Sequence, residues 1–351
     1  MTKLDKKHVQ KILIIKLRGI GDVILSTIVI RNLLKDFPSS EVHYLTEPPS
    51  HIILNEIPQI IKVHIFNRHG IFNRLKLFFN IRQEKYDLIL DFFTSTSTAL
   101  ICLFSGARYK AGFPYRIRKI AYNLFGPFER DRFHAAVLHL EFLKLLGISY
   151  EKDYLQIYLN DNVKLFAKNI IHNIISNNNL LVGVSPSGGW NSKKCDPSKF
   201  AEISDEVHSI YKANILILWG PSDLDDAIQI NKLMKSTSYL APSTNILQMA
   251  SLISECDILI SNDSGPMHIS TAIGTPVLSL HGPTNPLLQG PYGKKHECIR
   301  YEELNCIGCN LLECPRNHEC FLELPMENIL KKLEILLKKN GIIPQTYLQQ
   351  N

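Results

Sequence analysis

The sequence predicts an α/β protein built from two doubly wound, parallel-sheet domains, and three observations support this fold class. The chain has 351 residues, and at roughly 100–200 residues per domain this length favours two domains. Short apolar runs alternate with segments of helical apolar spacing, which is typical of parallel sheets. A composition of 45% hydrophobic and 21% charged residues is that of a globular protein, so a disordered, collagen-like or coiled-coil chain is excluded.

The first half of the chain begins with a strand, a glycine-containing turn and a helix. The apolar run 11–17 precedes the turn 18–22, and residues 23–35 have helical apolar spacing. Further strands are predicted at 41–45, 62–66 and 86–93, and a helix at 134–146.

A second α/β series follows an asparagine-rich segment at 176–179, where we place the domain boundary. Its predicted strands are 180–185, 214–219, 257–261 and 276–280. The predicted domains are therefore residues 1–175 and 176–330. Residues 331–351 form the remainder of an amphipathic helix at 326–338 and a loose tail at 345–351.

The charge balance is mildly basic, because 39 Lys and Arg residues stand against 33 Asp and Glu residues, a net charge of +6. This surplus is compatible with an acidic small molecule, an anionic lipid or nucleic acid. The polar residues 1–10 do not resemble a secretory signal, and no apolar run reaches the roughly 18 residues of a membrane span. We therefore expect a soluble cytoplasmic protein.

The first candidate site is the turn 18–22, since ligands of open parallel sheets bind beyond the carboxyl ends of the strands. Gly19 and Gly21 allow a tight turn and a close approach of backbone to ligand. Asp22 is either a helix N-cap or a group that faces the ligand, and spacing alone leaves both open. A dinucleotide fingerprint is disfavoured because Ile24 stands where its third glycine would be.

Two further candidate sites follow predicted strands in the second half. Residues 261–268 end a strand, turn through small residues and start a helix, whose N-terminus would attract an anion. Residues 281–286 form a turn in which Thr284 is a candidate phosphate contact.

These motifs carry a family resemblance. KLRGIGDVILS at 16–26, NDSGPMHISTAIGTP at 262–276 and GPTNP at 282–286 closely resemble glycosyltransferase family 9, the ADP-heptose:lipopolysaccharide heptosyltransferases. The resemblance extends from about residue 11 to about residue 330. It implies a GT-B architecture, with two Rossmann-like domains facing a central cleft, the acceptor on the N-terminal domain and the nucleotide sugar on the C-terminal one. It also implies inverting transfer of heptose from ADP-heptose to a lipopolysaccharide inner-core acceptor, without a catalytic cofactor.

The resemblance assigns the general base to Asp22, within a loop whose Arg18 and Gly21 would contact the acceptor. A family lysine three residues before a proline contacts phosphate, and this position matches Lys194. The family usually has an aromatic residue where this chain has Asp196, so Lys193 remains a competitor. Catalysis would therefore rest on Asp22 and Lys194.

The nucleotide sugar would be held by residues from several strand ends. Asp223 would contact the ribose, with Asp225 as the alternative, and the backbone near Thr244 would line the adenine pocket. A metal-binding D-x-D at 223–225 is disfavoured because it belongs to a different glycosyltransferase architecture. The complete set of expected nucleotide-sugar contacts is Ser185, Ser187, Asp223, Thr244, Asp263, Ser264, Gly265, His268 and Thr284.

Residues 106–132 carry much of the positive surplus, with seven basic residues against two acidic ones and with interleaved aromatic residues. A solvated basic face is the default explanation, and no nucleic-acid motif accompanies it. In the context of the resemblance, the segment suggests an anionic glycolipid acceptor and peripheral contact with the inner face of the cytoplasmic membrane. The expected acceptor contacts here are Arg108, Lys110, Arg116 and Arg118.

Four cysteines, Cys306, Cys309, Cys314 and Cys320, are spaced closely enough to hold a structural zinc ion. Four reduced thiols are the alternative, and an iron–sulfur cluster is less favoured. Two other functions also stay open: the same fold with another nucleotide sugar or acceptor, and a non-catalytic nucleotide-binding paralogue. The presence of Asp22 favours an enzyme.

Overall fold

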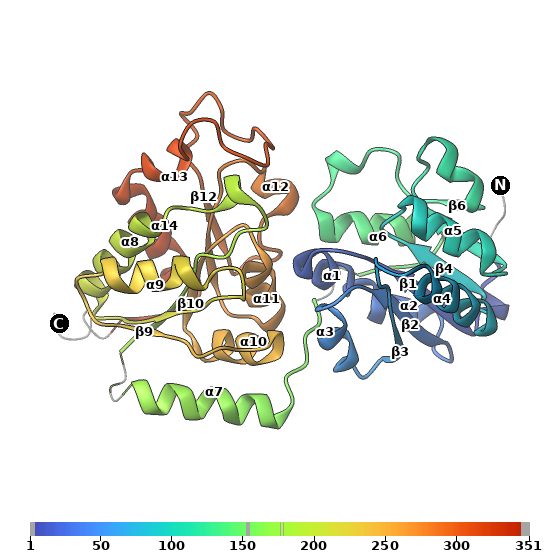
Figure 1. Ribbon diagram of the computed structural model, residues 1–351, viewed down its shortest axis with the longest axis horizontal. Coiled ribbons are helices and arrows are strands. Elements are labelled where there is room, and N and C mark those ends of the chain that lie inside the picture. Colours follow the sequence, from blue (N-terminus) through green and yellow to red (C-terminus); the bar gives the residue numbers. More distant parts are fainter. Residues whose placement is uncertain (1–3, 152–154, 176, 178, 345–351) are drawn as a thin grey trace. The chain divides into compact units, whose positions relative to one another are not determined.

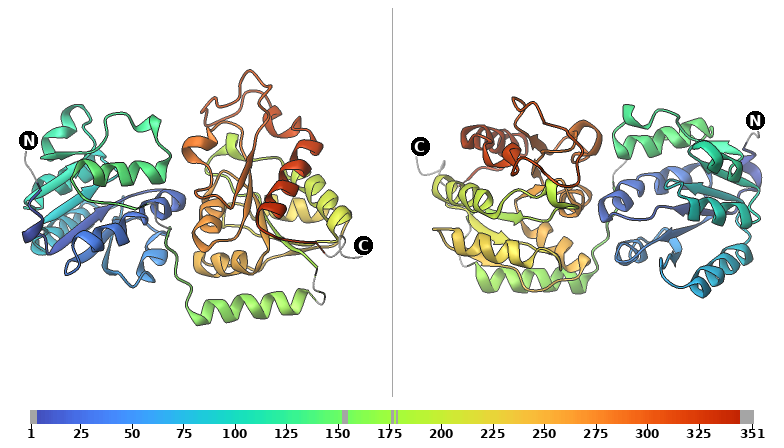
Figure 2. Two further views of the ribbon diagram at one scale, coloured as in Figure 1. Left: turned by 180° about the vertical axis from the view of Figure 1, so that it is seen from behind. Right: turned by 45° about the horizontal axis from the view of Figure 1, so that its top comes forward.

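The computed structural model describes residues 4–151, 155–175, 177 and 179–344. The chain divides into two compact units, Met1–Tyr158 and Leu159–Asn351, each with its own parallel sheet. Figure 1 shows both units, and Figure 2 shows them from two further directions. The predicted tail at 345–351 lies outside the described residues.

The sheet of unit 1 has six parallel strands in the order β3-β2-β1-β4-β5-β6. The central strand β1 forms because its apolar run is buried on both faces, and Ile12 to Ile15 are wholly inaccessible to solvent. The strands are β1 (Lys11–Ile15), β2 (Glu41–Thr46), β3 (Ile60–Ile65), β4 (Leu88–Asp91), β5 (Tyr109–Gly112) and β6 (Leu124–Phe125).

Helices cover both faces of this sheet. α4 and α5 pack on one face, where their apolar residues join those of β1, β2 and β4 in one core. α6 contacts α1 and α2. The elements are η1 (Lys6–His8), α1 (Ile20–Ser26), α2 (Val29–Asp36), α3 (His51–Asn55), α4 (Ile71–Gln83), α5 (Thr96–Phe104), η2 (Arg116–Ala121), η3 (Arg130–Arg132) and α6 (Ala135–Leu145).

The sheet of unit 2 repeats the same topology, since its order β12-β11-β10-β7-β8-β9 has the first strand of the unit beside the fourth. All its strand pairs are parallel. The strands are β7 (Leu181–Ser185), β8 (Asn214–Ile217), β9 (Ser238–Leu240), β10 (Ile258–Asn262), β11 (Val277–Leu280) and β12 (Glu297–Ile299). The predicted architecture of two doubly wound, parallel-sheet α/β units is therefore confirmed.

The helices of unit 2 also lie on both faces of their sheet (Figure 1). α8 contacts α9 and α14, and α10 contacts α11 and α7. The elements are α7 (Asp161–Ile174), η4 (Asn191–Lys193), α8 (Pro197–Tyr211), α9 (Leu224–Leu233), α10 (Ile246–Glu255), α11 (Gly265–Ile273), α12 (Pro286–Gln289), α13 (Glu319–Leu322) and α14 (Met326–Lys339). Among the described residues, none of these helices has the length and hydropathy needed to cross a bilayer.

The unit boundaries differ from the predicted domains in two places. α7 packs along α10, so it belongs to unit 2, and the division falls after Tyr158 rather than at 175/176. The asparagine-rich segment 176–179, only part of which the structure describes, therefore follows a helix of unit 2 and does not separate the two units. α14 is not an appendage, since Leu333, Leu336 and Leu337 are buried in the core of unit 2.

Candidate active site

The predicted site segments follow the two central strands of each sheet, where the order in which successive strands are added reverses. In unit 1, β1 and β4 are adjacent although their helices leave toward opposite sides, and the turn 18–22 follows β1. In unit 2, β7 and β10 have the same relation, and segments 186–197 and 263–268 follow them. Such reversals leave space for a ligand beyond the carboxyl ends of the strands.

Asp22 lies in the first turn of α1, but it is not the N-cap. Gly19 occupies the cap position, with a φ of 58° that a residue with a side chain rarely adopts. A Cβ atom at Gly19 would lie 2.8 Å from Asp22 Oδ2, so glycine lets the carboxylate fold over the turn. The Asp22 side chain is 52% exposed, which leaves it accessible to a substrate hydroxyl.

Lys16 is a candidate site residue that was not predicted from the sequence. Its Nζ lies 3.1 Å from Asp22 Oδ1, and its own side chain is only 7% exposed. The buried Lys16 ammonium holds the Asp22 carboxylate in one orientation by this ion pair. The available signal was a lysine that ends an otherwise apolar run, directly before the glycine turn.

Arg18 and Gly21 also lie at this edge of the sheet. Arg18 is exposed with a φ of 61°, and its guanidinium carbon is 6.0 Å from the centre of the Phe93 ring, just after β4. Gly21 is buried in the first turn of α1. The structure therefore brings Arg18, Gly21 and Asp22 together.

In unit 2, Asp263 is the centre of a buried polar cluster after β10. Its Oδ2 lies 2.6 Å from Lys193 Nζ and accepts a hydrogen bond of 2.6 Å from Thr284 Oγ1. Burial acts to raise the pKa of Asp263, but the charge and hydrogen bond of Lys193 together with the nearby His281 and His268 lower it overall. Lys193 Nζ also lies 4.0 Å from the centre of the Trp190 ring. This cluster joins the turns that follow β7, β10 and β11.

Lys194 forms a second polar cluster with residues that follow β7 and β8. Its Nζ lies 3.0 Å from Asp223 Oδ1 and 2.8 Å from Asp226 Oδ2. Ser187 Oγ donates a 2.7 Å hydrogen bond to Asp223 Oδ2. Burial acts to lower the pKa of Lys194, whereas its bonds with the two carboxylates raise it, so the side chain is an ammonium. Three predicted site residues thus meet at one point.

Asn262, another residue that was not predicted, ties these turns together. Its amide donates to Pro186 O at 2.8 Å and accepts from Cys195 N at 3.2 Å. Ser185 and Ser261 are direct neighbours across β7 and β10, and both are wholly buried. Among the described residues, neither of their hydroxyls has a hydrogen-bond partner. Unpaired buried hydroxyls are costly, so they favour a ligand contact near the strand ends.

The other predicted contacts take less central positions. Ser264 is the N-cap residue of α11, but its side chain does not cap the first turn, and Gly265 begins that helix. His268 is buried in the same helix. Thr244 lies in the loop before α10, and no hydrogen bond connects it to the Lys194 cluster among the described residues. Asp225 is exposed on α9.

Comparisons with known proteins agree with this arrangement. The family model described as glycosyltransferase family 9 (heptosyltransferase) matches residues 74–318, more than half of the chain. The chain belongs to glycosyltransferase family 9. It is therefore a glycosyltransferase. The lipopolysaccharide core heptosyltransferase OpsX of Haemophilus influenzae is 27% identical over 297 residues, covering 83% of this chain and 84% of that protein.

Solved structures share the fold of this family 9 member. A family 9 glycosyl transferase from Veillonella parvula superposes with a TM-score of 0.84 at 21% identity, covering 96% of this chain and 99% of the other. The E. coli ADP-heptose lps heptosyltransferase II has a TM-score of 0.77 at 19% identity, covering 95% and 100%. At these identities the structural likeness establishes the fold alone.

The basic segment 106–132 of this glycosyltransferase is not one surface. Its interleaved aromatic residues Tyr109, Phe113 and Tyr122 are buried in the core, because they belong to β5 and the turns beside it. Arg108 and Lys110 lie at the start of β5, toward the edge opposite Asp22. Arg116 and Arg118, predicted as acceptor contacts with them, follow β5 at the same edge as Asp22.

The four cysteines of segment 306–320 do not form a closed metal site in this structure. Cys306 and Cys314 are partly buried, Cys309 is exposed and Cys320 is buried, and all are free thiols. Among the described residues, the one group of three or more His, Cys, Asp or Glu side chains with ligand atoms within 4.8 Å is His43, His64 and Glu84. No three of the four sulfur atoms therefore lie at the mutual distances that tetrahedral zinc requires. A structural zinc ion at these four cysteines therefore stays a prediction.

Hydrogen bonds and ion pairs already engage most of the polar atoms of the His43 group. The Tyr86 hydroxyl lies 2.8 Å from His43 Nδ1 and 2.7 Å from His64 Nε2, between the two imidazoles. Both Glu84 oxygens are paired, with Lys62 at 2.5 Å and Lys11 at 3.0 Å. A dication would face these two ammonium groups, so we interpret the group as a buried hydrogen-bond network.

This network makes unit 1 sensitive to acid. Burial, with the nearby Lys62 charge, lowers the pKa of His64 to about 4. The unfolded chain takes up a proton near pH 6.5 and the folded one only near pH 4, so stability present above pH 6.5 is lost as the pH falls toward 4. The loss from His64 amounts to about 3 kcal/mol. Hydrogen exchange of β2 and β3 amides should show this loss, and His64→Gln should flatten it; an unchanged slope would contradict the assignment.

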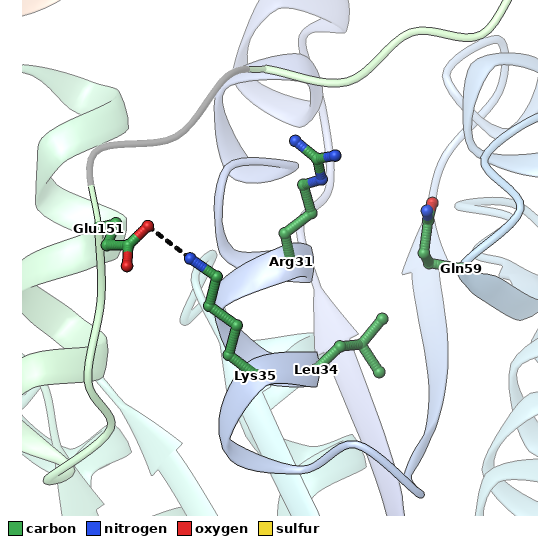
Figure 3. A pocket seen from close by; sticks show the side chains of 5 residues that line it. All are labelled: Arg31, Leu34, Lys35, Gln59 and Glu151. Atoms are coloured by element: carbon green, nitrogen blue, oxygen red, sulfur yellow. Dashed lines mark hydrogen bonds and ion pairs between the residues drawn. The ribbon is translucent and has the colours of Figure 1, made fainter.

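A shallow pocket of about 530 Å³ lies elsewhere on unit 1 (Figure 3). It is lined by Arg31, Leu34, Lys35, Gln59 and Glu151, and Lys35 pairs with Glu151 at 2.5 Å. Gln59 directly precedes β3, so the pocket lies toward the amino ends of the strands. It is therefore separate from the turn that carries Asp22.

Proposed function

We propose that this glycosyltransferase transfers heptose from ADP-heptose to a lipopolysaccharide inner-core acceptor, with inversion at the anomeric carbon. The observation that carries the proposal is the Asp22 carboxylate, which is half-exposed at the carboxyl end of β1 and paired with buried Lys16. Family membership and the named activities of OpsX and heptosyltransferase II support the choice of heptose and acceptor. The name of the second enzyme includes ADP-heptose, which supports the choice of donor.

In the proposed reaction, Asp22 is the general base. Its carboxylate takes the proton of an acceptor hydroxyl while that oxygen forms a bond to the anomeric carbon. The bond from this carbon to the diphosphate breaks on the opposite side, and ADP leaves with the electron pair. Proton transfer to a positioned carboxylate contributes roughly 10²–10⁴-fold in rate.

The departing diphosphate needs positive charge in place before it leaves. Lys194 supplies this charge when it exchanges a carboxylate of Asp223 or Asp226 for a phosphate oxygen. The N-terminus of α11 supplies the amides of Ser264 and Gly265, with His268 in the same helix. This lysine and helix end serve the role that a metal has in other transferases, so we propose that no cofactor is required.

The remaining donor contacts divide into binding and positioning groups. Asp223 and Ser187 would bind the ribose, Ser185 would offer its unpaired hydroxyl, and Thr244 would line the adenine site. Asp263 and Thr284 are already bonded to each other, and Asp263 also pairs with Lys193. We therefore propose that these two hold the α11 turn in place rather than contact the donor.

On the acceptor side, Arg18, Gly21, Arg116 and Arg118 lie at the edge of the sheet that carries Asp22. An arginine guanidinium can form two parallel hydrogen bonds with a carboxylate or phosphate of an anionic glycolipid. We expect no nucleic-acid partner. Arg108 and Lys110 start β5 at the other edge and are not included among the proposed contacts. A lipid-linked acceptor places the enzyme at the inner face of the cytoplasmic membrane.

A thermal-shift titration with ADP, UDP, GDP and CDP tests the donor. We expect ADP alone to stabilise the protein, by about 2.7 kcal/mol at a concentration 100 times its Kd. A preference for UDP would overturn the donor while keeping the fold. No shift with any nucleotide would favour the non-catalytic paralogue over the enzyme.

A further inference from the structure

One surface of unit 1 exposes apolar side chains that the transfer reaction does not explain. It is formed by α4, α5 and η2, and we call it the α4–α5–η2 face. Its exposed apolar residues are Phe72, Leu75, Phe79, Leu100, Leu103, Phe104, Ile117 and Ile120. Its basic residues are Arg74, Lys76, Arg82, Arg116, Arg118 and Lys119.

The apolar residues of α4 form a stripe that points away from the protein. Leu77 and Ile81 are buried against the sheet, whereas Phe72, Leu75 and Phe79 recur at helical spacing and are 82%, 58% and 61% exposed. On η2, Ile117 is 81% and Ile120 is 70% exposed. A cluster of this kind, unlike scattered surface leucines, marks an interaction site.

The three elements form a continuous surface. The rings of Phe78 on α4 and Phe104 on α5 lie edge to face, with centres 6.4 Å apart. Arg82 Nη1 donates to Phe104 O at 3.0 Å, and Arg118 Nη1 donates to Thr94 O at 2.6 Å. Figures 1 and 2 show α4 and α5 side by side on unit 1, and η2 contacts α5.

The charge of this face has one sign. Its three elements contain six basic residues and, in the sequence, no Asp or Glu. Among the residues that the structure describes, none of the six forms an ion pair. Exposed apolar side chains beside cations that have no carboxylate partner among the described residues are complementary to an anionic bilayer. Its acyl chains can accept the apolar side chains, and its lipid phosphates can pair with the cations.

We propose that the α4–α5–η2 face docks on an anionic lipid bilayer and inserts its aromatic residues below the phosphates. The inference rests on the proposed function, because an enzyme for a lipid-linked acceptor needs a route to the membrane. A second copy of the chain is a poorer occupant, since a two-fold contact through this face would bring identical cations together.

The position of the face agrees with this role. Arg118 bonds the backbone at Thr94, and the neighbouring Phe93 ring lies under Arg18, which belongs to the Asp22 turn. α4, α5 and η2 each follow a strand at its carboxyl end, the edge where Asp22 lies. Docking therefore brings the acceptor edge of unit 1 close to the lipid surface.

Vesicle cosedimentation tests the proposal with the full chain. We expect binding to phosphatidylcholine vesicles that contain phosphatidylglycerol, at least tenfold weaker binding to phosphatidylcholine alone, and weakening by salt. The triple variant Phe72→Ser/Leu75→Ser/Phe79→Ser and the variant Arg74→Glu/Lys76→Glu/Lys119→Glu should each lose at least tenfold in affinity. The matched control Leu165→Ser/Leu287→Ser/Leu312→Ser removes three exposed leucines of unit 2 and should bind normally.

Insertion and self-association separate the outcomes. In a Phe79→Trp variant, brominated acyl chains should quench the new fluorescence relative to the Phe79 parent. Normal vesicle binding by both the triple serine and the triple glutamate variant would overturn the proposal, as would a dimer in sedimentation that the triple serine variant abolishes. Transfer to a delipidated core oligosaccharide should persist in all α4 variants. Its loss in the parent protein would instead count against the proposed function.

Discussion

Replacing Asp22 by Asn should reduce kcat by about 10²–10⁴-fold, because the amide cannot take the proton of the acceptor hydroxyl. Affinity for ADP should stay unchanged, since the proposed nucleotide contacts all come from unit 2. Steady-state transfer assays and ADP titration calorimetry measure the two quantities. Asp22→Asn should lower the melting temperature modestly, because the buried Lys16 ammonium then faces an amide in place of its carboxylate partner.

Asp225→Asn is the matched control for this substitution. Asp225 is an exposed acid on α9, and the proposed ribose contact is Asp223, which lies in the Lys194 cluster in its place. It should retain near-normal turnover. Near-wild-type transfer by Asp22→Asn would remove Asp22 as the base, while an equal loss in Asp225→Asn would show that the assay reports a general effect of lost charge.

Substituting the two adjacent lysines one at a time should separate stability from binding. Lys193→Met leaves Asp263 charged and buried, with Thr284 as its remaining hydrogen-bond partner of those described. Breaking a buried ion pair in this way costs about 3–5 kcal/mol of unfolding free energy. Urea unfolding followed by tryptophan fluorescence measures this, because both tryptophans, Trp190 and Trp219, lie in unit 2. A Lys193→Met/Asp263→Leu double variant removes both charges and should recover much of the loss.

Lys194→Met should show the opposite pattern. Lys194 is partly exposed, and its loss removes a charge-assisted bond to phosphate worth about 1.5–3 kcal/mol, or roughly 10–150-fold in the Kd for ADP. Its stability should change far less than that of Lys193→Met. If Lys193→Met weakens ADP binding and Lys194→Met unfolds the protein instead, the phosphate lysine is Lys193 and the register across Asp196 is shifted by one residue.

The positions of the site segments could be predicted because they depend on local chemistry. A strand that ends before Arg18 and a strand that ends at Asn262 are both followed by small residues and a helix, and the parallel order places them at sheet reversals. The identity of the partners could not be predicted, because Lys193, Asp263 and Thr284 are far apart in the sequence. They meet only when β7, β10 and β11 pair.

Lys16 and the short strands show a second limit of prediction from sequence. An apolar run that ends in lysine predicts a strand end, but the contact of Lys16 with Asp22 depends on the left-handed turn at Arg18 and Gly19. β5, β6, β9 and β12 have two to four residues each, too few for a periodicity to appear. β5 has the sequence YKAG. Because Lys110 is basic, this buried strand was interpreted as part of a basic surface.

The misplaced boundary and the cysteines have a common physical cause. Composition indicates where a chain turns, but it does not indicate which other elements a helix or a side chain contacts. α7 lies before the asparagine-rich turn and still packs on α10, and the cysteines are near in sequence without forming a group of metal-ligating distance. Such choices follow from packing, which local sequence does not encode.

Transfer itself is the most direct test of the proposed chemistry. Purified protein is incubated with ADP-heptose and a delipidated inner-core oligosaccharide, and the product is analysed by NMR at its new anomeric carbon. We expect stoichiometric ADP release and a glycosidic bond whose anomeric configuration is opposite to that of the donor. A product that retains the donor configuration, or transfer from another nucleotide sugar but not from ADP-heptose, would contradict the proposal.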